Sequence, residues 1–226
     1  YVDDEGRIVR ETINRPLSGP WDFLNTYIVN IYPDTTCWVN DFKNSENETY
    51  LRNYFSNPAY NDYPVVGVTW EQANAFCAWR TDYLLKGLGP EARYIQRYRL
   101  PPEAEWEYAA RGGRYSRHTT LSGSIYTVQV AAYIDNASSK VVPVKKYLAN
   151  ELGIYDMSGN AWEWCQDSYA TYSEAAVTDP YVNEPGEMRV MRGGSAASRW
   201  DACRVSNRSG IPASSMKGTF GFRLAL

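Results

Sequence analysis

The segment Gly153-Ile-Tyr-Asp-Met-Ser-Gly-Asn-Ala-Trp-Glu-Trp164 decides the fold of this chain, together with three further segments around it. These are Tyr63-Pro-Val-Val-Gly-Val-Thr-Trp-Glu-Gln-Ala73, Tyr98-Arg-Leu-Pro-Pro-Glu-Ala-Glu-Trp-Glu-Tyr-Ala-Ala-Arg-Gly-Gly113, and Arg192-Gly-Gly-Ser195 with the terminal Gly221-Phe-Arg-Leu224. Each segment alone is a weak signal. The ordered set is specific, and it extends from residue 63 to residue 226.

Start and stop signals predict two helices. Thr69 and Gln72 fit a capping box, and apolar side chains then recur at helical spacing, which predicts a helix from Thr69 to near Gly87. A second helix is predicted over 103–110, because two prolines precede it and a Gly-Gly pair follows it.

The remaining segments are short strands and loops. Strands are predicted near 27–32, 98–100, 189–195 and 221–226, and residues 21–64 otherwise favour loops because helical periodicity is weak there. Two helices, several short strands and long loops indicate an irregular, loop-rich α+β domain.

Composition restricts the partners. The chain has 226 residues, with 23 Lys+Arg against 26 Asp+Glu and a formal net charge of −3. This balance argues against a nucleic-acid partner and against a polybasic membrane-binding surface. Cysteines stand at 37, 77, 165 and 203 without a C-x-x-C, and His118 is the one histidine, which argues against a Cys/His zinc cluster.

The four ordered segments resemble the formylglycine-generating enzyme (sulfatase-modifying factor) family. That resemblance implies an irregular fold similar to C-type lectins, in agreement with the loop-rich pattern. We expect a sulfatase-modifying-factor-like domain over 63–226. Residues 1–62 are expected to form an irregular entry or insertion segment of the same domain.

The resemblance also exposes a lost catalytic group. Family enzymes place a cysteine three residues after the Ser of Arg-Gly-Gly-Ser and a second one five residues later, and the two thiolates bind copper(I). Here these positions are Ser198 and Cys203. A serine hydroxyl is a hard, neutral ligand that does not suit copper(I). We therefore expect no bound copper, a buried structural role for Cys203, and a pseudoenzyme.

Calcium is the metal that the resemblance leaves open. Family members bind it through two side chains and two backbone carbonyls, at positions that correspond here to Asp156, Gly159, Ala161 and Glu163. Hard oxygen ligands suit this ion. The plainer interpretation is that Asp156 and Glu163 hydrogen-bond a tight turn around Gly159-Asn160.

Residues 32–67 resemble a narrower group, the gliding-motility and type IX secretion lipoproteins of Bacteroidota of the GldK/PorK or GldJ type. That likeness implies a non-catalytic subunit of a ring on the periplasmic side of the outer membrane. The expected partners are other copies of the chain and a GldN/PorN-type protein. Membrane association is expected only through a lipid on a cysteine outside this sequence.

Two other functions stay open. One is an altered oxidase of the same family, copper-dependent or using Cys203 alone, and the other is a carbohydrate-binding module, by analogy with the lectin-like fold. A triad of Ser198 and His118 is disfavoured, because no nucleophile-elbow motif supports it.

The last expectations concern packing. The three tryptophans 106, 162 and 164 are expected to fill the core, and His118 is expected at the surface. Arg192 and Arg223 are expected to pair with buried carboxylates such as Glu105 or Glu107, a choice that the sequence leaves open.

Overall fold

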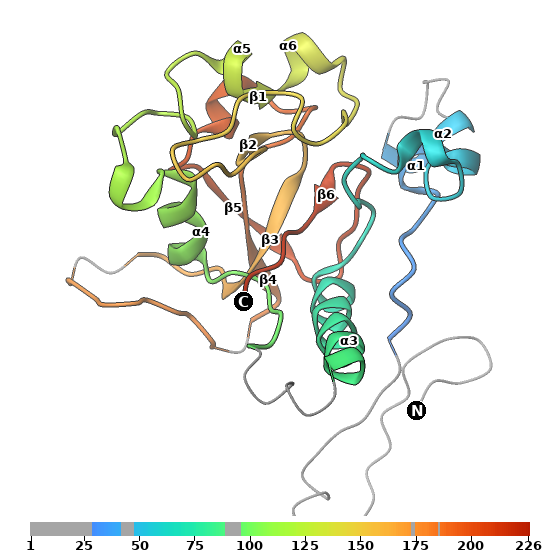
Figure 1. The fold of residues 1–226 in the computed structure, drawn as a ribbon, viewed down its shortest axis with the longest axis horizontal. Coiled ribbons are helices and arrows are strands. Elements are labelled where there is room, and N and C mark those ends of the chain that lie inside the picture. The colour runs from blue at the N-terminus through green and yellow to red at the C-terminus, as the bar shows by residue number, and fades with distance from the viewer. Residues whose placement is uncertain (1–28, 42–47, 89–95, 173–174, 185) are drawn as a thin grey trace, which may run out of the picture. The chain divides into compact units, whose positions relative to one another are not determined.

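A four-stranded sheet runs through the middle of the domain (Figure 1). The structure, a computed structural model, describes residues 29–41, 48–88, 96–172, 175–184 and 186–226. Residues 31–226 form one compact unit. The strand order is β5-β4-β3-β6, with β3 antiparallel to β4, β4 antiparallel to β5, and β3 parallel to β6. The strands are β3 (Trp162–Ser168), β4 (Met188–Arg192), β5 (Arg208–Pro212) and β6 (Phe220–Gly221).

Both faces of this sheet are buried. Successive side chains of a strand point to opposite faces. Trp164 and Met191 therefore pack with Ala73 and Cys77 of helix α3 (Trp70–Leu88) on one face. Their neighbours Cys165 and Val190 pack with Trp106 on the other face. The alternation of side chains along the two central strands thus packs one helix against each face of the sheet, the long α3 on one face and the short α4 on the other.

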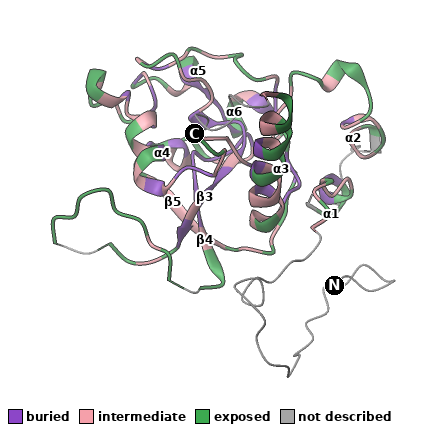
Figure 2. Ribbon diagram, turned by 60° about the horizontal axis from the view of Figure 1, so that its bottom comes forward, coloured by how far each residue is buried: buried purple, intermediate pink, exposed green. Residues whose placement is uncertain are grey.

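The predicted start of α3 is confirmed. The backbone N–H of Thr69 donates to Gln72 Oε1 at 2.9 Å, and the N–H of Gln72 donates to Thr69 Oγ1 at 3.2 Å, which is the reciprocal capping box. The helix ends at Leu88, one residue past the predicted glycine. Figure 2 shows buried residues along one side of α3 and exposed residues along the other.

Helix α4 (Glu103–Ala110) has the predicted bounds. Gly112 follows it with φ of +86°, in the left-handed region that glycine adopts without a steric penalty. A Cβ at Gly112 would also lie 2.5 Å from Glu151 Oε2, so a larger residue does not fit there. Trp106 and Trp164 are buried as predicted, and Trp162 is partly buried.

The prediction of loops with short strands over 21–64 is confirmed for residues 29–36 and 61–64, which form loops, and is wrong where the chain forms short helices. Residues 29–32 form no strand, and the chain makes helices α1 (Cys37–Asp41) and α2 (Glu48–Asn53) and the 3-10 helix η2 (Pro58–Tyr60). Aromatic rings hold these short helices together, because Trp38 lies 4.5 Å from Tyr54 between ring centroids and both are buried. The cluster continues into Val66 and Ala161.

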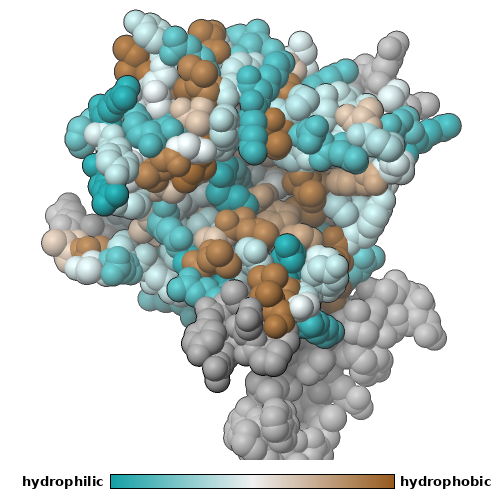
Figure 3. All heavy atoms as spheres, in the orientation of Figure 1, coloured by the Kyte–Doolittle hydropathy of each residue, from teal (hydrophilic) through white to brown (hydrophobic). Residues whose placement is uncertain are grey.

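Short elements complete the described part of the chain. They are η4 (Gly113–Tyr115), α5 (Thr127–Val130), α6 (Ile134–Ala137), η5 (Trp200–Cys203), and the parallel pair β1 (Ala131–Ala132) and β2 (Ser158–Gly159). Among the described residues, none of the helices has the length and apolar character that crossing a bilayer requires. On the face seen in Figure 3, hydrophobic side chains form small groups among hydrophilic ones.

A buried ionic network joins α4 to the sheet. The guanidinium of Arg192 is 0% exposed and pairs with Glu107, with Glu103 at 3.5 Å. Arg208 of β5 pairs with the same Glu103 at 2.6 Å. The sequence left open whether Arg192 pairs with Glu105 or with Glu107. Its partner is Glu107, and Glu105 instead pairs at the surface with Arg99.

Removing the central cation of this network should be costly. We expect Arg192→Leu to lower the free energy of unfolding by about 3–5 kcal/mol, because the buried carboxylate of Glu103 and the partly buried one of Glu107 lose their shared partner. Urea unfolding followed by circular dichroism measures this change. The matched control is Arg99→Ala, whose exposed pair should be worth about 1 kcal/mol or less. Equal losses in the two variants would contradict the assignment.

Candidate functional site

The two positions of the family's catalytic cysteines follow β4 directly. The chain leaves β4 through Gly193 and Gly194, whose φ angles of +95° and +73° favour glycine. A Cβ at Gly194 would lie 2.9 Å from Cys203 Sγ. The absence of a side chain at Gly194 therefore brings the Arg-Gly-Gly-Ser turn against η5 and sets Ser198 and Cys203 in the same corner of the fold.

Ser198 closes a turn with Ser195. Its Oγ accepts the backbone N–H of Ser195 at 3.1 Å and lies 2.9 Å from Ser195 Oγ, and its own N–H donates to the Ser195 carbonyl at 2.9 Å. The carbonyl of Ser198 accepts the N–H of Ile134 at 3.0 Å, which ties the turn to α6. The hydroxyl thus has a local structural partner.

Cys203 is a core residue, as predicted. It is 0% exposed and packs with Leu121, Val130, Ala131 and Tyr133. Burial, with a smaller effect from the charge of Asp201, raises the pKa of its thiol to about 12. At neutral pH the sulfur is therefore protonated. All four cysteines are buried, and none of them forms a disulfide bond, which answers the question that the sequence left open.

His118 does not share this corner's hydrogen bonds. It lies in an exposed loop with φ of +57°, and its backbone N–H donates to Ser116 Oγ. The surface position predicted for it is confirmed. The described bonds of the Ser198 hydroxyl run to Ser195, so the arrangement is not that of a serine hydrolase.

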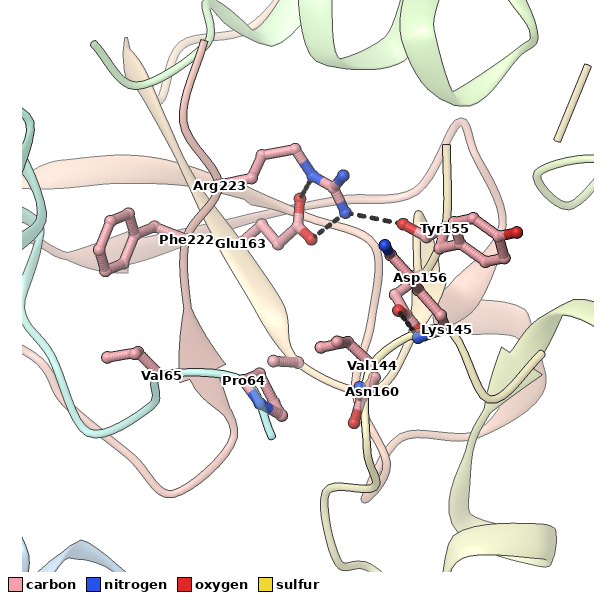
Figure 4. A pocket seen from close by; sticks show the side chains of 11 residues that line it. Pro64, Val65, Val144, Lys145, Tyr155, Asp156, Asn160, Glu163, Phe222 and Arg223 are labelled. Atoms are coloured by element: carbon pink, nitrogen blue, oxygen red, sulfur yellow. Dashed lines mark hydrogen bonds and ion pairs between the residues drawn. The ribbon is translucent and has the colours of Figure 1, made fainter. Parts of the chain in front are cut away.

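Three of the four predicted calcium residues, Asp156, Ala161 and Glu163, line a cavity of about 300 Å³ in a second location, and Gly159 is not among its lining residues (Figure 4). Glu163 enters it from β3 and Arg223 from the last segment of the chain. Arg223 donates from Nε to Glu163 Oε2 and from Nη2 to Oε1, both at 2.5 Å. Trp106 Nε1 donates to the same Oε2 at 2.6 Å. Arg223 therefore pairs with Glu163, a partner that the sequence did not indicate.

Asp156 lines the same cavity in a left-handed backbone conformation, with φ of +59°. Its Oδ2 accepts the N–H of Lys145 at 2.8 Å. Desolvation raises the pKa of this carboxyl and the charge of Glu163 adds to the rise, while the Lys145 N–H and the Arg223 charge oppose it. Figure 4 shows Lys145 beside Asp156 and Tyr155.

Backbone geometry explains the glycine and asparagine between these acids. A Cβ at Gly159 would lie 2.1 Å from the Ala132 carbonyl oxygen, so only glycine lets β1 and β2 pair. Asn160 is buried with φ of +67°, accepts the N–H of Val142 at Oδ1 and donates to its carbonyl. The contribution of Val144 and Lys145 to the cavity wall was not predicted, because nothing local in the sequence marks these residues.

The donors around this cavity do not fit calcium as they are arranged. Both oxygens of Glu163 receive N–H groups from a guanidinium, and the positive charge of Arg223 occupies the space beside them. Within the described residues, no three His, Cys, Asp or Glu side chains come together as a metal-binding group. Asp156 and Glu163 act here as hydrogen-bond acceptors, and the calcium assignment stays a prediction.

Comparison with known proteins establishes the family. A family model described as the sulfatase-modifying factor enzyme 1-like domain matches residues 7–226. The chain belongs to this family. Its α+β fold is that of the family, because the structure of Treponema denticola variable protein 1 superposes with a TM-score of 0.65 at 30% identity, covering 75% of this chain and 73% of that one.

Two curated relatives show how far the likeness extends. The formylglycine-generating enzyme of Streptomyces coelicolor is 34% identical over 184 residues, or 73% of this chain and 52% of that protein. The serine/threonine-protein kinase Pkn1 of Chlamydia trachomatis serovar L2 is 37% identical over 172 residues, or 74% of this chain. The match spans about half of the first relative and 25% of the second.

The state of the cysteines can be checked with a thiol reagent. We expect the native protein to react with less than about 0.1 equivalent of dithiobis-nitrobenzoate within minutes near pH 8, because a buried neutral thiol is unreactive. In guanidinium chloride all four thiols should react. A rapid native equivalent that disappears in Cys203→Ala would show that this sulfur is an accessible thiolate instead.

The cavity at Glu163 permits a second check. Because Arg223 already neutralises Glu163, adding millimolar calcium to chelator-treated protein should move the thermal midpoint by less than about 1 °C. Differential scanning calorimetry measures the midpoint, with Glu163→Gln as the matched variant. A stabilisation of several degrees that Glu163→Gln abolishes would mean that the carboxylate leaves Arg223 to bind the ion.

Proposed function

We propose that this protein is a non-catalytic structural subunit of the Bacteroidota type IX secretion and gliding motility machinery. The single observation that supports the loss of catalysis is which residues occupy the family's two catalytic positions. Ser198 stands where family enzymes have the first cysteine and is bonded to Ser195, and Cys203 is fully buried. One sulfur and one hydroxyl do not make the two-thiolate site that copper(I) favours.

The chemistry of Cys203 strengthens this point. A thiol binds metal or attacks a substrate as the thiolate, and a pKa raised to about 12 leaves almost none of that form at neutral pH. Desolvation is the largest cause of the shift, so a solvent-exposed copper site is not available at this sulfur. We therefore propose that no copper is bound.

The structural role is proposed from the first part of the described chain. The segment 32–67, which resembles the gliding lipoproteins, contains helices α1 and α2, and packed aromatic rings hold them together. Tyr54 donates its hydroxyl to the Pro64 carbonyl at 2.6 Å, which fastens this aromatic cluster to the rest of the domain. Tyr32 and Val39 remain exposed on it and supply an apolar contact for a neighbouring subunit.

The proposed setting follows the same resemblance. The protein would face the periplasm at the outer membrane, anchored by a lipid on a cysteine outside this sequence. It would form a ring with further copies of itself and with a GldN/PorN-type partner. Membership of the family supports the type of domain. The ring and the location are our proposal.

Assembly is the property to test. We expect the full-length protein, co-expressed with a GldN/PorN-type protein, to co-purify with it as a large ring visible by electron microscopy. Ser198→Ala should assemble normally, because that hydroxyl serves only its own turn. In Tyr32→Asp, whose charge lies on the exposed aromatic cluster, ring yield should fall severalfold at unchanged thermal stability.

Two outcomes would overturn the proposal. A stable monomer that recovers no partner would contradict the structural role. Oxidation of a cysteine-containing sulfatase peptide in the presence of copper, or tight stoichiometric copper(I) binding lost in Cys203→Ala, would instead establish the altered oxidase.

A further inference from the structure

We infer that a tyrosine-lined groove between α4 and the described loop residues 169–172 and 175–182 binds an uncharged oligosaccharide. Two adjoining hollows of about 590 and 730 Å³ form it, and they share Ala104, Tyr108, Pro180 and Tyr181. None of the residues that line them belongs to the Ser198 turn or to the cavity at Glu163. The inference stands independently of the proposed ring.

One wall is a rigid stack of rings. The guanidinium of Arg208 lies between Tyr169, at 4.5 Å from the ring centroid, and Tyr172, at 4.1 Å. Tyr172 also donates its hydroxyl to Glu103 Oε1 at 3.0 Å, which orients the ring, and yet the residue is 61% exposed. An exposed aromatic ring held by a cation on one face and a hydrogen bond at its tip is a preorganised platform.

Gly210 makes the stack possible. A Cβ at this position would lie 2.5 Å from the ring of Tyr169, so the absence of a side chain lets Tyr169 lie flat against β5. The order of layers is then the β5 backbone, Tyr169, Arg208 and Tyr172. Tyr172 is the outermost layer, and it cannot turn inward because the layers below it are filled.

The opposite wall and the rim carry further rings. Tyr108 projects from α4 and is 59% exposed, and Tyr181 is 43% exposed on the loop. Leaving three tyrosines this exposed around one groove forfeits burial of large apolar rings, which is expected where a ligand covers them. The apolar face of a pyranose ring packs on such flat surfaces.

The floor supplies hydrogen-bonding groups, and its two arginines already have carboxylate partners. Arg208 binds Glu103 through Nε at 2.8 Å and Nη2 at 2.6 Å, and Glu107 pairs with Arg111 and Arg192. Both arginines that line the groove are therefore paired, and an anionic ligand finds no free cation there. Carboxylates keep spare lone pairs after such pairing, and these accept hydroxyl groups.

Asp167 completes the floor, and its carboxylate is held by two backbone N–H groups. Its Oδ2 accepts the N–H of Glu103 at 2.7 Å and its Oδ1 accepts the N–H of Val182 at 3.1 Å. The carboxylate thus fixes α4 to the loop and holds the groove open at a set width. The lining includes five carboxylates, those of Glu103, Glu105, Glu107, Asp167 and Asp179, against two paired arginines, which disfavours an anionic ligand. Aromatic walls over this polar floor match a neutral ligand rich in hydroxyl groups.

The experiment titrates the protein with chitotriose, cellotriose and maltotriose by NMR. We expect at least one trisaccharide to bind with a Kd below about 1 mM, and Tyr172→Ala to weaken it at least about tenfold. Tyr172→Phe keeps the ring and should weaken binding less. Trp79→Ala removes an exposed ring of α3 outside the groove and should leave binding unchanged.

Thermal unfolding of each variant verifies that it is folded. The inference is overturned if none of the three sugars binds at about 10 mM, or if Tyr172→Ala binds as well as the wild type. Peptide binding that depends on Tyr172, in a protein that binds no sugar, also overturns it. Ring assembly is measured separately, so failure of either proposal leaves the other standing.

Discussion

The fully buried guanidinium of Arg192 is the constraint on which the rest of the domain depends. A charge in the interior is tolerated only when it is paired and hydrogen-bonded. Arg192 meets that requirement through Glu107 and Glu103 of α4 and the Asn207 carbonyl before β5. Helix, central strand and edge strand are therefore held in a single relative position, which apolar packing alone would specify less sharply.

A second ionic group, centred on Glu163, repeats this principle. Glu163 of β3 receives Trp106 from α4 and Arg223 from the final segment of the chain. Three pieces distant in sequence thus share one carboxylate. Little regular structure is present, so such shared polar groups fix the relative positions of segments that long helices and strands would fix in other folds. This explains how a loop-rich chain keeps a defined fold.

Sequence reasoning succeeded where the signal was local. The capping box at Thr69, the prolines before Glu103 and the glycines after Ala110 act within one helical turn, so α3 and α4 were predicted to within a residue or two. Helices α1 and α2 have five and six residues, too few for a periodic pattern, and they form because rings pack around Trp38. The partner of Arg223 depends on three-dimensional proximity, and no pattern along the chain reveals it.

The corner that holds Ser198 and Cys203 shows how this fold keeps its structure without a cysteine pair at these positions. The hydroxyl of Ser198 bonds within its own turn, and Cys203 contributes as a packed apolar residue, so neither position needs a reactive thiolate to keep the corner folded. The buried ionic groups lie elsewhere, on α4 and the sheet. The side chains at positions 198 and 203 and the ionic groups that hold α4 to the sheet are therefore different residues, so a change at the former pair leaves the latter contacts in place.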